Sequence, residues 1–189
     1  VRNTAQITKA MEVVSATKMR RSQEFAVQAR PYATAALELM QNLLSRTVSL
    51  PALLCSREVK TTALLVVTSD KGLAGAFNAN ILRKAEAWIE EAEATKKEFV
   101  VIPIGKKAKE YMERRGVSIY ERYWGFGDYT QLEETLPIAD LLIQGFLKGD
   151  FDEVLGLYTN FRTTLTQEAV LRKILPATKE GIEDAIKSI

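Results

Sequence analysis

The chain of 189 residues has no histidine, a single cysteine (Cys55) and no long apolar run. Without histidine it lacks the commonest general base and the commonest metal ligand. One cysteine excludes an intrachain disulfide and a multi-cysteine metal site, and is typical of a reducing compartment. No apolar stretch approaches the roughly 18 to 20 residues that span a bilayer, so any membrane contact would go through a partner or a surface. We therefore predict no metal, no cofactor and no catalytic residues.

Positive charge is concentrated at the N-terminus. The net charge of the chain is +2, whereas residues 1–30 contain six Lys or Arg against two Glu, a net charge of +4. A basic element attached to a slightly acidic body fits docking to an acidic partner or to nucleic acid. The body has no basic patch and no recognisable nucleic-acid module, which favours the acidic partner. A solvated helix face is the simpler alternative.

Residues 1–46 have the pattern of one long amphipathic helix. The first thirty contain no Gly or Pro, and Ile7, Met11 and Val14 recur at the spacing of one helical face. Pro31 is expected to kink or interrupt the helix, which resumes to Arg46. Such a helix has more apolar surface than a small domain covers, so we expect a second helix beside it.

Residues 47–60 lack periodicity and form a predicted linker. The globular domain is predicted over 61–176, because apolar strand patterns there alternate with helical ones. A short polar connection between the last two strands predicts a hairpin. The fold class is therefore α/β, with a Rossmann-like, mostly parallel sheet and an antiparallel edge hairpin. The predicted strands are 62–67, 99–104, 117–120, 151–161 and 169–176, and the predicted helices are 78–98, 106–115 and 130–148, with a further one beginning in 177–189.

Local residues indicate where these helices begin and end. Asn78 is an acceptable cap for the first helix of the domain, and Gly116 ends the second. For the third, Thr130 with Glu133 forms a potential capping box, and Gly149 is the predicted stop. A start at Thr135 is the alternative, because it would place the following proline in the first turn.

The segment TSDKGLAGAFNANI (68–81) links a strand to a helix, where many proteins bind phosphates. Gly75 is followed by Ala76 rather than by the lysine and hydroxyl that complete a phosphate loop, and a third glycine is missing. A tight turn with glycines at positive φ is the simpler interpretation. Asp70 at the end of the strand either caps its own turn or, as the alternative function, serves a small nucleotide-binding domain or enzyme.

Aromatic residues gather in and beside the glycine-containing loop 121–129. Packing is the favoured role for this set, with part of it available to a partner. The set is Tyr120, Tyr123, Trp124, Phe126 and Tyr129.

Two stretches carry a family resemblance. NTAQITKAMEVVSATKMRRSQ (3–23) and TSDKGLAGAFNANI (68–81) resemble the gamma subunit of the rotary ATP synthase, and FDEVLGLYTNF and AVLRKILP follow in the expected order. The resemblance covers nearly the whole chain. It implies a non-catalytic rotor-stalk subunit that transmits torque between a membrane ring of c subunits and a hexamer of alpha and beta subunits. Residues 1–46 would then form half of a coiled-coil shaft, and 177–189 would begin a C-terminal segment that continues beyond this sequence.

The resemblance also implies partners and contact residues. The shaft would pass an acidic helix-turn-helix of the beta subunit, and further partners would be alpha, epsilon and the c-ring, with no nucleic acid. The protein would be peripheral on the cytoplasmic face of a bacterial plasma membrane, or alternatively on an organelle inner membrane, and would reach the membrane only through the c-ring. The implied beta-contact residues are Lys9, Met11, Lys18, Arg20, Arg21, Lys71, Leu73 and Ala74.

Overall fold

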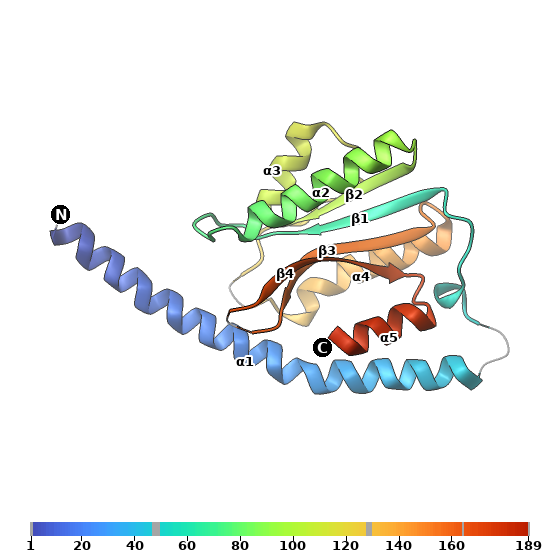
Figure 1. The fold of residues 1–189 in the computed structure, drawn as a ribbon, viewed down its shortest axis with the longest axis horizontal. Helices are drawn as coiled ribbons and strands as arrows, with labels where there is room; N and C mark the ends of the chain where they lie inside the picture. Colours follow the sequence, from blue (N-terminus) through green and yellow to red (C-terminus); the bar gives the residue numbers. More distant parts are fainter. Residues whose placement is uncertain (1, 47–49, 128–129, 164, 189) are drawn as a thin grey trace.

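A computed structural model (Figure 1) shows a mixed α/β domain with one long helix projecting from it. Within the part of the chain that it describes, no helix is both long and apolar enough to cross a membrane. The described residues are 2–46, 50–127, 130–163 and 165–188.

A four-stranded sheet forms the centre of the domain, with the strands in the order β2-β1-β3-β4. β1 pairs in parallel with both β2 and β3, whereas β4 is antiparallel to β3 at the edge. The prediction of a mostly parallel sheet with an edge hairpin is therefore confirmed. The strands are β1 (Thr61–Val67), β2 (Glu98–Ile104), β3 (Glu153–Phe161) and β4 (Gln167–Leu175).

The predicted strand at 117–120 is wrong. This segment makes only an isolated bridge, between Ile119 and Val101 of β2. It runs along the outer edge of β2 for too short a distance to form a ladder. The edge is instead protected by an irregular segment, which limits strand pairing with other chains.

Helices cover both faces of the sheet (Figure 1). Successive side chains of a strand point to opposite faces, so β1 contributes to two cores. Leu64 and Val66 pack with α2 (Phe77–Ala94) and α3 (Lys106–Arg115). Ala63 and Leu65 pack on the other face with α4 (Leu132–Lys148).

The caps predicted for two helices are wrong, although both helices begin within two residues of the predicted positions. α2 follows Ala76 without a side-chain cap, and the Asn78 side chain contacts Ser69 instead. α4 begins with a capping box made by Gln131 and Glu134, one residue later than predicted. The predicted glycine stops are confirmed, since Gly116 and Gly149 both take the left-handed conformation after α3 and α4, whereas α2 ends at Ala94 rather than at the predicted residue 98.

α1 (Arg2–Arg46) is one continuous helix that includes Pro31. The proline does not interrupt it, although Figure 1 shows a change of direction near the middle of the helix. The second half lies against α5 (Lys179–Ser188), as expected for a helix that needs a neighbour. Gln41 of α1 donates a hydrogen bond to Glu183 of α5 at 3.3 Å.

The predicted linker is anchored to the domain after residue 50, where a short 3-10 helix (Ala52–Leu54) precedes the anchor; residues 47–49 lie outside the described part. Arg57 donates from Nη2 to the carbonyls of Phe146 and Phe151, at 2.8 and 2.7 Å. Its Nε lies 2.7 Å from Oδ1 of Asp152. The second Asp152 oxygen accepts the backbone N–H groups that lead into β1, at Lys60 and Thr61.

Candidate functional site

The first half of α1 is an amphipathic helix beside which no second helix packs in the described part of the chain. Every described residue from 3 to 22 is exposed, and the segment projects away from the domain in Figure 1. The apolar face predicted from Ile7, Met11 and Val14 is exposed at 62%, 51% and 53%. Helical stability in proteins comes mainly from the packing of such an apolar face. We therefore expect another segment or chain to pack against it.

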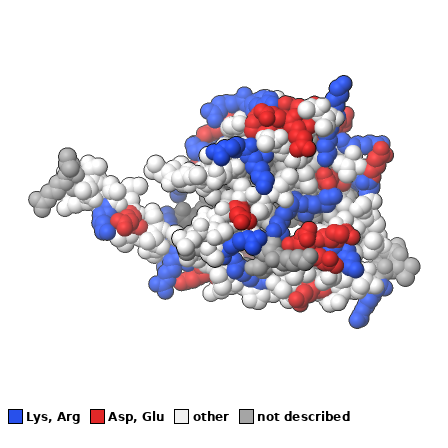
Figure 2. Space-filling model, in the orientation of Figure 1, with Lys and Arg blue, Asp and Glu red and all other residues white. Residues whose placement is uncertain are grey.

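The charges on this projecting segment are partly paired within α1. Lys9 lies 3.2 Å from Glu12, and Arg20 lies 3.0 Å from Glu24. Figure 2 shows blue and red side chains next to each other along the projecting helix rather than an unbroken basic stripe. These pairs are highly exposed and therefore weak, so an acidic partner can replace them at small free-energy cost.

The loop between β1 and α2 presents the other predicted contact residues. Lys71, Leu73 and Ala74 are all exposed, and Leu73 is 98% exposed. Positive φ occurs at Gly75 (54°), as predicted for a glycine, but the second such position is Leu73 (59°) rather than Gly72. A leucine with positive φ is uncommon, and here it points an apolar side chain into solvent.

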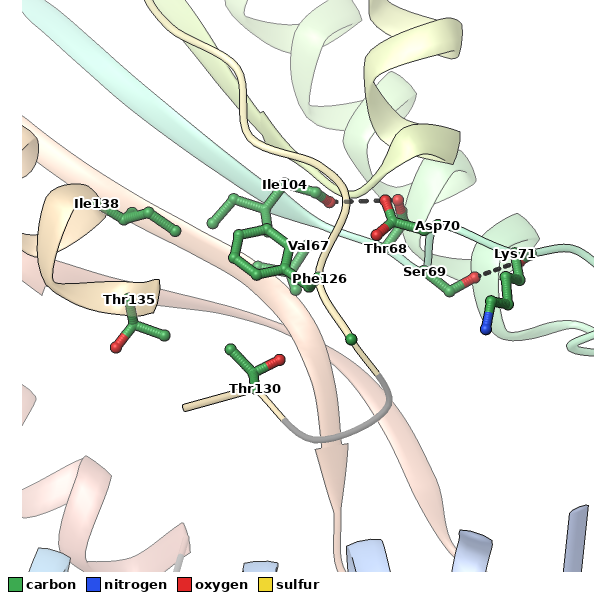
Figure 3. Close-up of a pocket in the computed structure, with 11 residues that line it drawn as sticks. Val67, Thr68, Ser69, Asp70, Lys71, Ile104, Phe126, Thr130, Thr135 and Ile138 are labelled. Atoms are coloured by element: carbon green, nitrogen blue, oxygen red, sulfur yellow. Dashed lines mark hydrogen bonds between the residues drawn. The ribbon is translucent and has the colours of Figure 1, made fainter. Parts of the chain in front are cut away.

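Hydrogen bonds at its two ends hold this loop. Oδ1 of Asn78 accepts the backbone N–H of Ser69 at 3.0 Å, which ties the start of the loop to the start of α2. The Ser69 hydroxyl donates to the Lys71 carbonyl at 2.6 Å (Figure 3). These hydrogen bonds restrain the two ends of the loop, and its exposed tip extends from them.

Asp70 connects the loop to two other segments. Its Oδ1 accepts the backbone N–H of Lys106 at 2.6 Å, at the start of α3, where a negative charge is favourable. Its Oδ2 accepts the backbone N–H of Gly125 at 2.8 Å. Asp70 thus caps another helix and another loop, and the expectation that it caps its own turn is wrong.

A cavity of about 530 Å³ lies beside Asp70, at the carboxyl ends of the parallel strands (Figure 3). In α/β folds this is the usual place for a ligand. Here two polar side chains that follow β1 are already engaged: the Thr68 hydroxyl accepts from the Ala108 N–H at 2.8 Å, and the Asp70 carboxylate accepts two backbone N–H groups. The described residues contain no cluster of three potential metal ligands. This geometry gives no support to the nucleotide-binding or enzymatic alternative.

Replacement of Asp70 tests its role as a connector. Asp70→Ala should lower the free energy of unfolding by about 1 to 2 kcal/mol, because two N–H groups lose a charged acceptor. Amide exchange at Lys106 and Gly125, measured by NMR, should become faster. Asp70→Asn keeps one carbonyl oxygen and should lose about half as much. Unchanged exchange at both amides in Asp70→Ala would contradict the connector role.

The aromatic loop is partly packed and partly exposed. Tyr123 and Phe126 join the α4-side core, as the sequence favours. Trp124 remains 51% exposed and Tyr120 37% exposed, whereas Tyr129 lies outside the described residues. Burial raises the pKa of the Tyr123 hydroxyl, as expected for a ring placed against the core.

These features define an α/β domain that exposes two elements, the first half of a long helix and the loop after β1. The sequence matches the family described as ATP synthase over residues 1–188. The ATP synthase gamma chain of Roseiflexus castenholzii is 44% identical over 179 residues, which are 93% of this chain and 62% of that protein. The gamma chain of Rippkaea orientalis is 41% identical over 187 residues, covering 97% of this chain and 59% of its own length.

The fold agrees with this assignment. The chain matches a solved chain of the central stalk and c-ring of the Tetrahymena thermophila mitochondrial ATP synthase with a TM-score of 0.68, at 23% identity, over 90% of this chain and 72% of that one. The chain belongs to the family of ATP synthase gamma chains. It spans about 60% of the length of the curated relatives described above.

Proposed function

We propose that this chain is part of the central rotor-stalk subunit of a proton-translocating ATP synthase. The subunit transmits torque between the membrane c-ring and the catalytic alpha/beta hexamer and breaks no bonds itself. The observation that carries the proposal is the projecting half of α1, whose apolar and charged groups are all exposed. The match of the chain to gamma chains over nearly the whole of its 189 residues supports the same role.

The physical properties of α1 suit a shaft. A continuous helix of 45 residues is about 68 Å long at a rise of about 1.5 Å per residue. Exposed ion pairs are each worth about 0 to 1 kcal/mol, so contacts with a surrounding acidic partner form and break at every step. Such a shaft pushes its partner without binding it permanently.

The proposed contacts with beta involve both exposed features. Met11 faces the acidic helix-turn-helix of beta, and the basic side chains of α1 supply attraction nearby. Lys71 and Leu73, with Ala74, meet the same acidic element at some rotor angles. Alpha, epsilon and the c-ring are the further proposed partners, and the complex is proposed to lie on the cytoplasmic face of a bacterial plasma membrane, with the organelle inner membrane as the alternative. The basic residues concerned are Lys9, Lys18, Arg20 and Arg21.

Reconstitution tests the proposed function. A full-length protein, of the length of the gamma-chain relatives, should co-assemble with purified alpha and beta subunits and yield a complex with ATPase activity. Size-exclusion chromatography and a coupled ATPase assay measure the two results. Failure to co-assemble would overturn the proposal.

Substitution of Met11 tests the shaft contact. Met11→Lys adds a positive charge against the acidic element, which should strengthen the rotor–beta contact and slow its release at each step. We expect ATP-driven proton pumping in membrane vesicles to fall about threefold or more per ATP hydrolysed, since one added ion pair in a partly desolvated contact is worth about 1 kcal/mol. Met11→Leu, which conserves volume and charge, is the matched control and should pump normally. Equal pumping by the two variants would place Met11 outside the contact.

A further inference from the structure

α4 carries a second row of apolar side chains besides the one that it buries against the sheet. The buried row includes Ile138, Leu142 and Phe146. The members of the second row follow one another at intervals of 4, 3, 4 and 4 residues, which places them on one side of the helix within about 80°. α4 is therefore apolar on two sides, although only one of them faces the core. This outer row consists of Leu132, Leu136, Ala139, Ile143 and Leu147.

The outer row is open to solvent. Leu132 is 70% exposed, Leu136 49% and Leu147 48%. α2, which covers the other face of the sheet (Figure 1) and is described over its whole length, has no large apolar side chain among its exposed residues. Charged side chains such as Arg83 and Glu90 occupy its exposed side instead. Leucines on an exposed helix face are therefore a particular property of α4, and such a patch is typical of an interaction site.

The two ends of α4 are fixed, so the outer row keeps its shape. The capping box of Gln131 and Glu134 closes its first turn, and Gly149 follows its last turn in the left-handed conformation. From Leu132 to Leu147 the row extends about 22 Å, or about four turns. A row with this spacing and length packs well against a second helix, with the side chains of one helix between those of the other. Because the row is already ordered, little conformational entropy is lost when a partner binds.

The charge beside the outer row is negative. Glu133 and Asp140 lie seven residues apart on the side of α4 next to the row, and both are exposed. Neither carboxylate forms an ion pair within the part of the chain that the structure describes. Lys148, the one basic residue of α4, lies in the last turn, about 100° around the helix from Leu147. Unpaired carboxylates beside apolar side chains favour a basic partner, and they disfavour an anionic lipid surface or a second copy of the same face.

We infer that the outer row of α4 is a docking surface for an amphipathic helix of another protein chain, whose apolar side is bordered by Lys or Arg. The inference goes beyond the proposed function, because it uses neither α1 nor the loop after β1. It places a partner on the face of the sheet that α4 covers.

Site-specific photo-crosslinking tests this surface. The full-length protein, with benzoylphenylalanine in place of Leu136, is irradiated in cells that also express the chains that assemble with it. We expect a covalent product with a second protein, and mass spectrometry should place the attachment in a helical segment where Lys and Arg outnumber Asp and Glu. The matched control has the same group in place of Arg83, which is exposed on α2, and should give this product in a yield lower by about tenfold or more.

Several results of this experiment would overturn the inference. These are no product from position 136, an equal yield from position 83, or a product with the same chain, a second copy, a lipid or an acidic segment. Alpha and beta subunits that purify with the protein are detected separately in the same sample. Their absence would contradict the proposed function and would leave the result at position 136 unaffected.

Charge reversal tests the nature of the partner helix. In Asp140→Lys the yield of the product from position 136 should fall by about threefold or more, because a like charge now faces the basic side chains of the partner. Glu90→Lys is the matched control, since Glu90 is exposed on α2 and its reversal should leave the yield unchanged. Circular dichroism checks that both variants fold. An undiminished yield in Asp140→Lys would show that the partner segment is not basic there and would overturn the inference.

Discussion

Gly105→Ala is expected to lower the free energy of unfolding by about 3 to 5 kcal/mol, through backbone strain added to a steric clash. Gly105 is buried and has a φ of +92°, which side-chain-bearing residues rarely adopt. A Cβ atom there would lie 2.2 Å from the carbonyl oxygen of Thr68. Because that obstacle is backbone, β1 and the turn after β2 would have to move apart. The hydrogen bonds of Thr68 and Asp70 to α3 would be lost with them.

Gly116→Ala separates strain from the clash. Gly116 also has positive φ (+74°), but nothing lies within 4 Å of the added Cβ. We therefore expect a loss of about 1 kcal/mol, the penalty for an alanine in the left-handed region. Urea denaturation followed by circular dichroism measures both variants. Equal losses would show that the close approach at Gly105 relaxes without penalty.

Arg57→Ala should lower the free energy of unfolding by about 2 to 4 kcal/mol, because a partly buried guanidinium with several partners is removed. Asp152, only 15% exposed, would lose its ion pair, and two carbonyls would lose their donor. The melting temperature should fall by about 5 to 12 °C for a chain of this size. Arg57→Lys keeps the charge but not the planar donor fork, and should recover only part of the loss. Full recovery by lysine would show that charge alone matters.

The same site predicts an acid-dependent loss of stability. Hydrogen bonds from the Thr61 and Lys60 backbone, with the charge of Arg57, hold the pKa of the Asp152 carboxyl below its ordinary value. A depressed folded-state pKa gives stability that is complete above the unfolded-state pKa and is lost as the pH falls through the folded-state pKa. In Arg57→Ala the acid-dependent part should shrink but persist, because the backbone donors remain. Urea midpoints measured through the acid range check this.

The parts of the fold that follow from local pattern could be predicted from the sequence. Continuous apolar runs identified β1 and β2, and glycines identified the ends of α3 and α4. The prediction of a strand at 117–120 was wrong, because a short β-prone run does not reveal whether a neighbouring strand pairs with it along its whole length. The caps proposed for α2 and α4 were wrong, because Asn78 bonds to Ser69 instead and Gln131, a neighbour of Thr130, caps α4.

The candidate site was harder to predict because its supports are distant in sequence. Asp70 contacts groups 36 and 55 residues away, and no local rule selects such partners. The positive φ at Leu73 was missed because glycines stand on either side of the true position. By contrast, the pairs Lys9–Glu12 and Arg20–Glu24 have the i,i+3 and i,i+4 spacing of helix neighbours, so the sequence already contains their signal.

The three-way connection at Asp70 has a mechanical consequence. A force on the exposed tip at Leu73 reaches β1 along the chain, and it also reaches α3 and the loop of Gly125 through the two carboxylate oxygens. The load is thus divided over three supports that are all tied into the sheet. A loop braced in this way deflects less than one attached only at its two ends, so a push received at its tip is delivered to the whole domain.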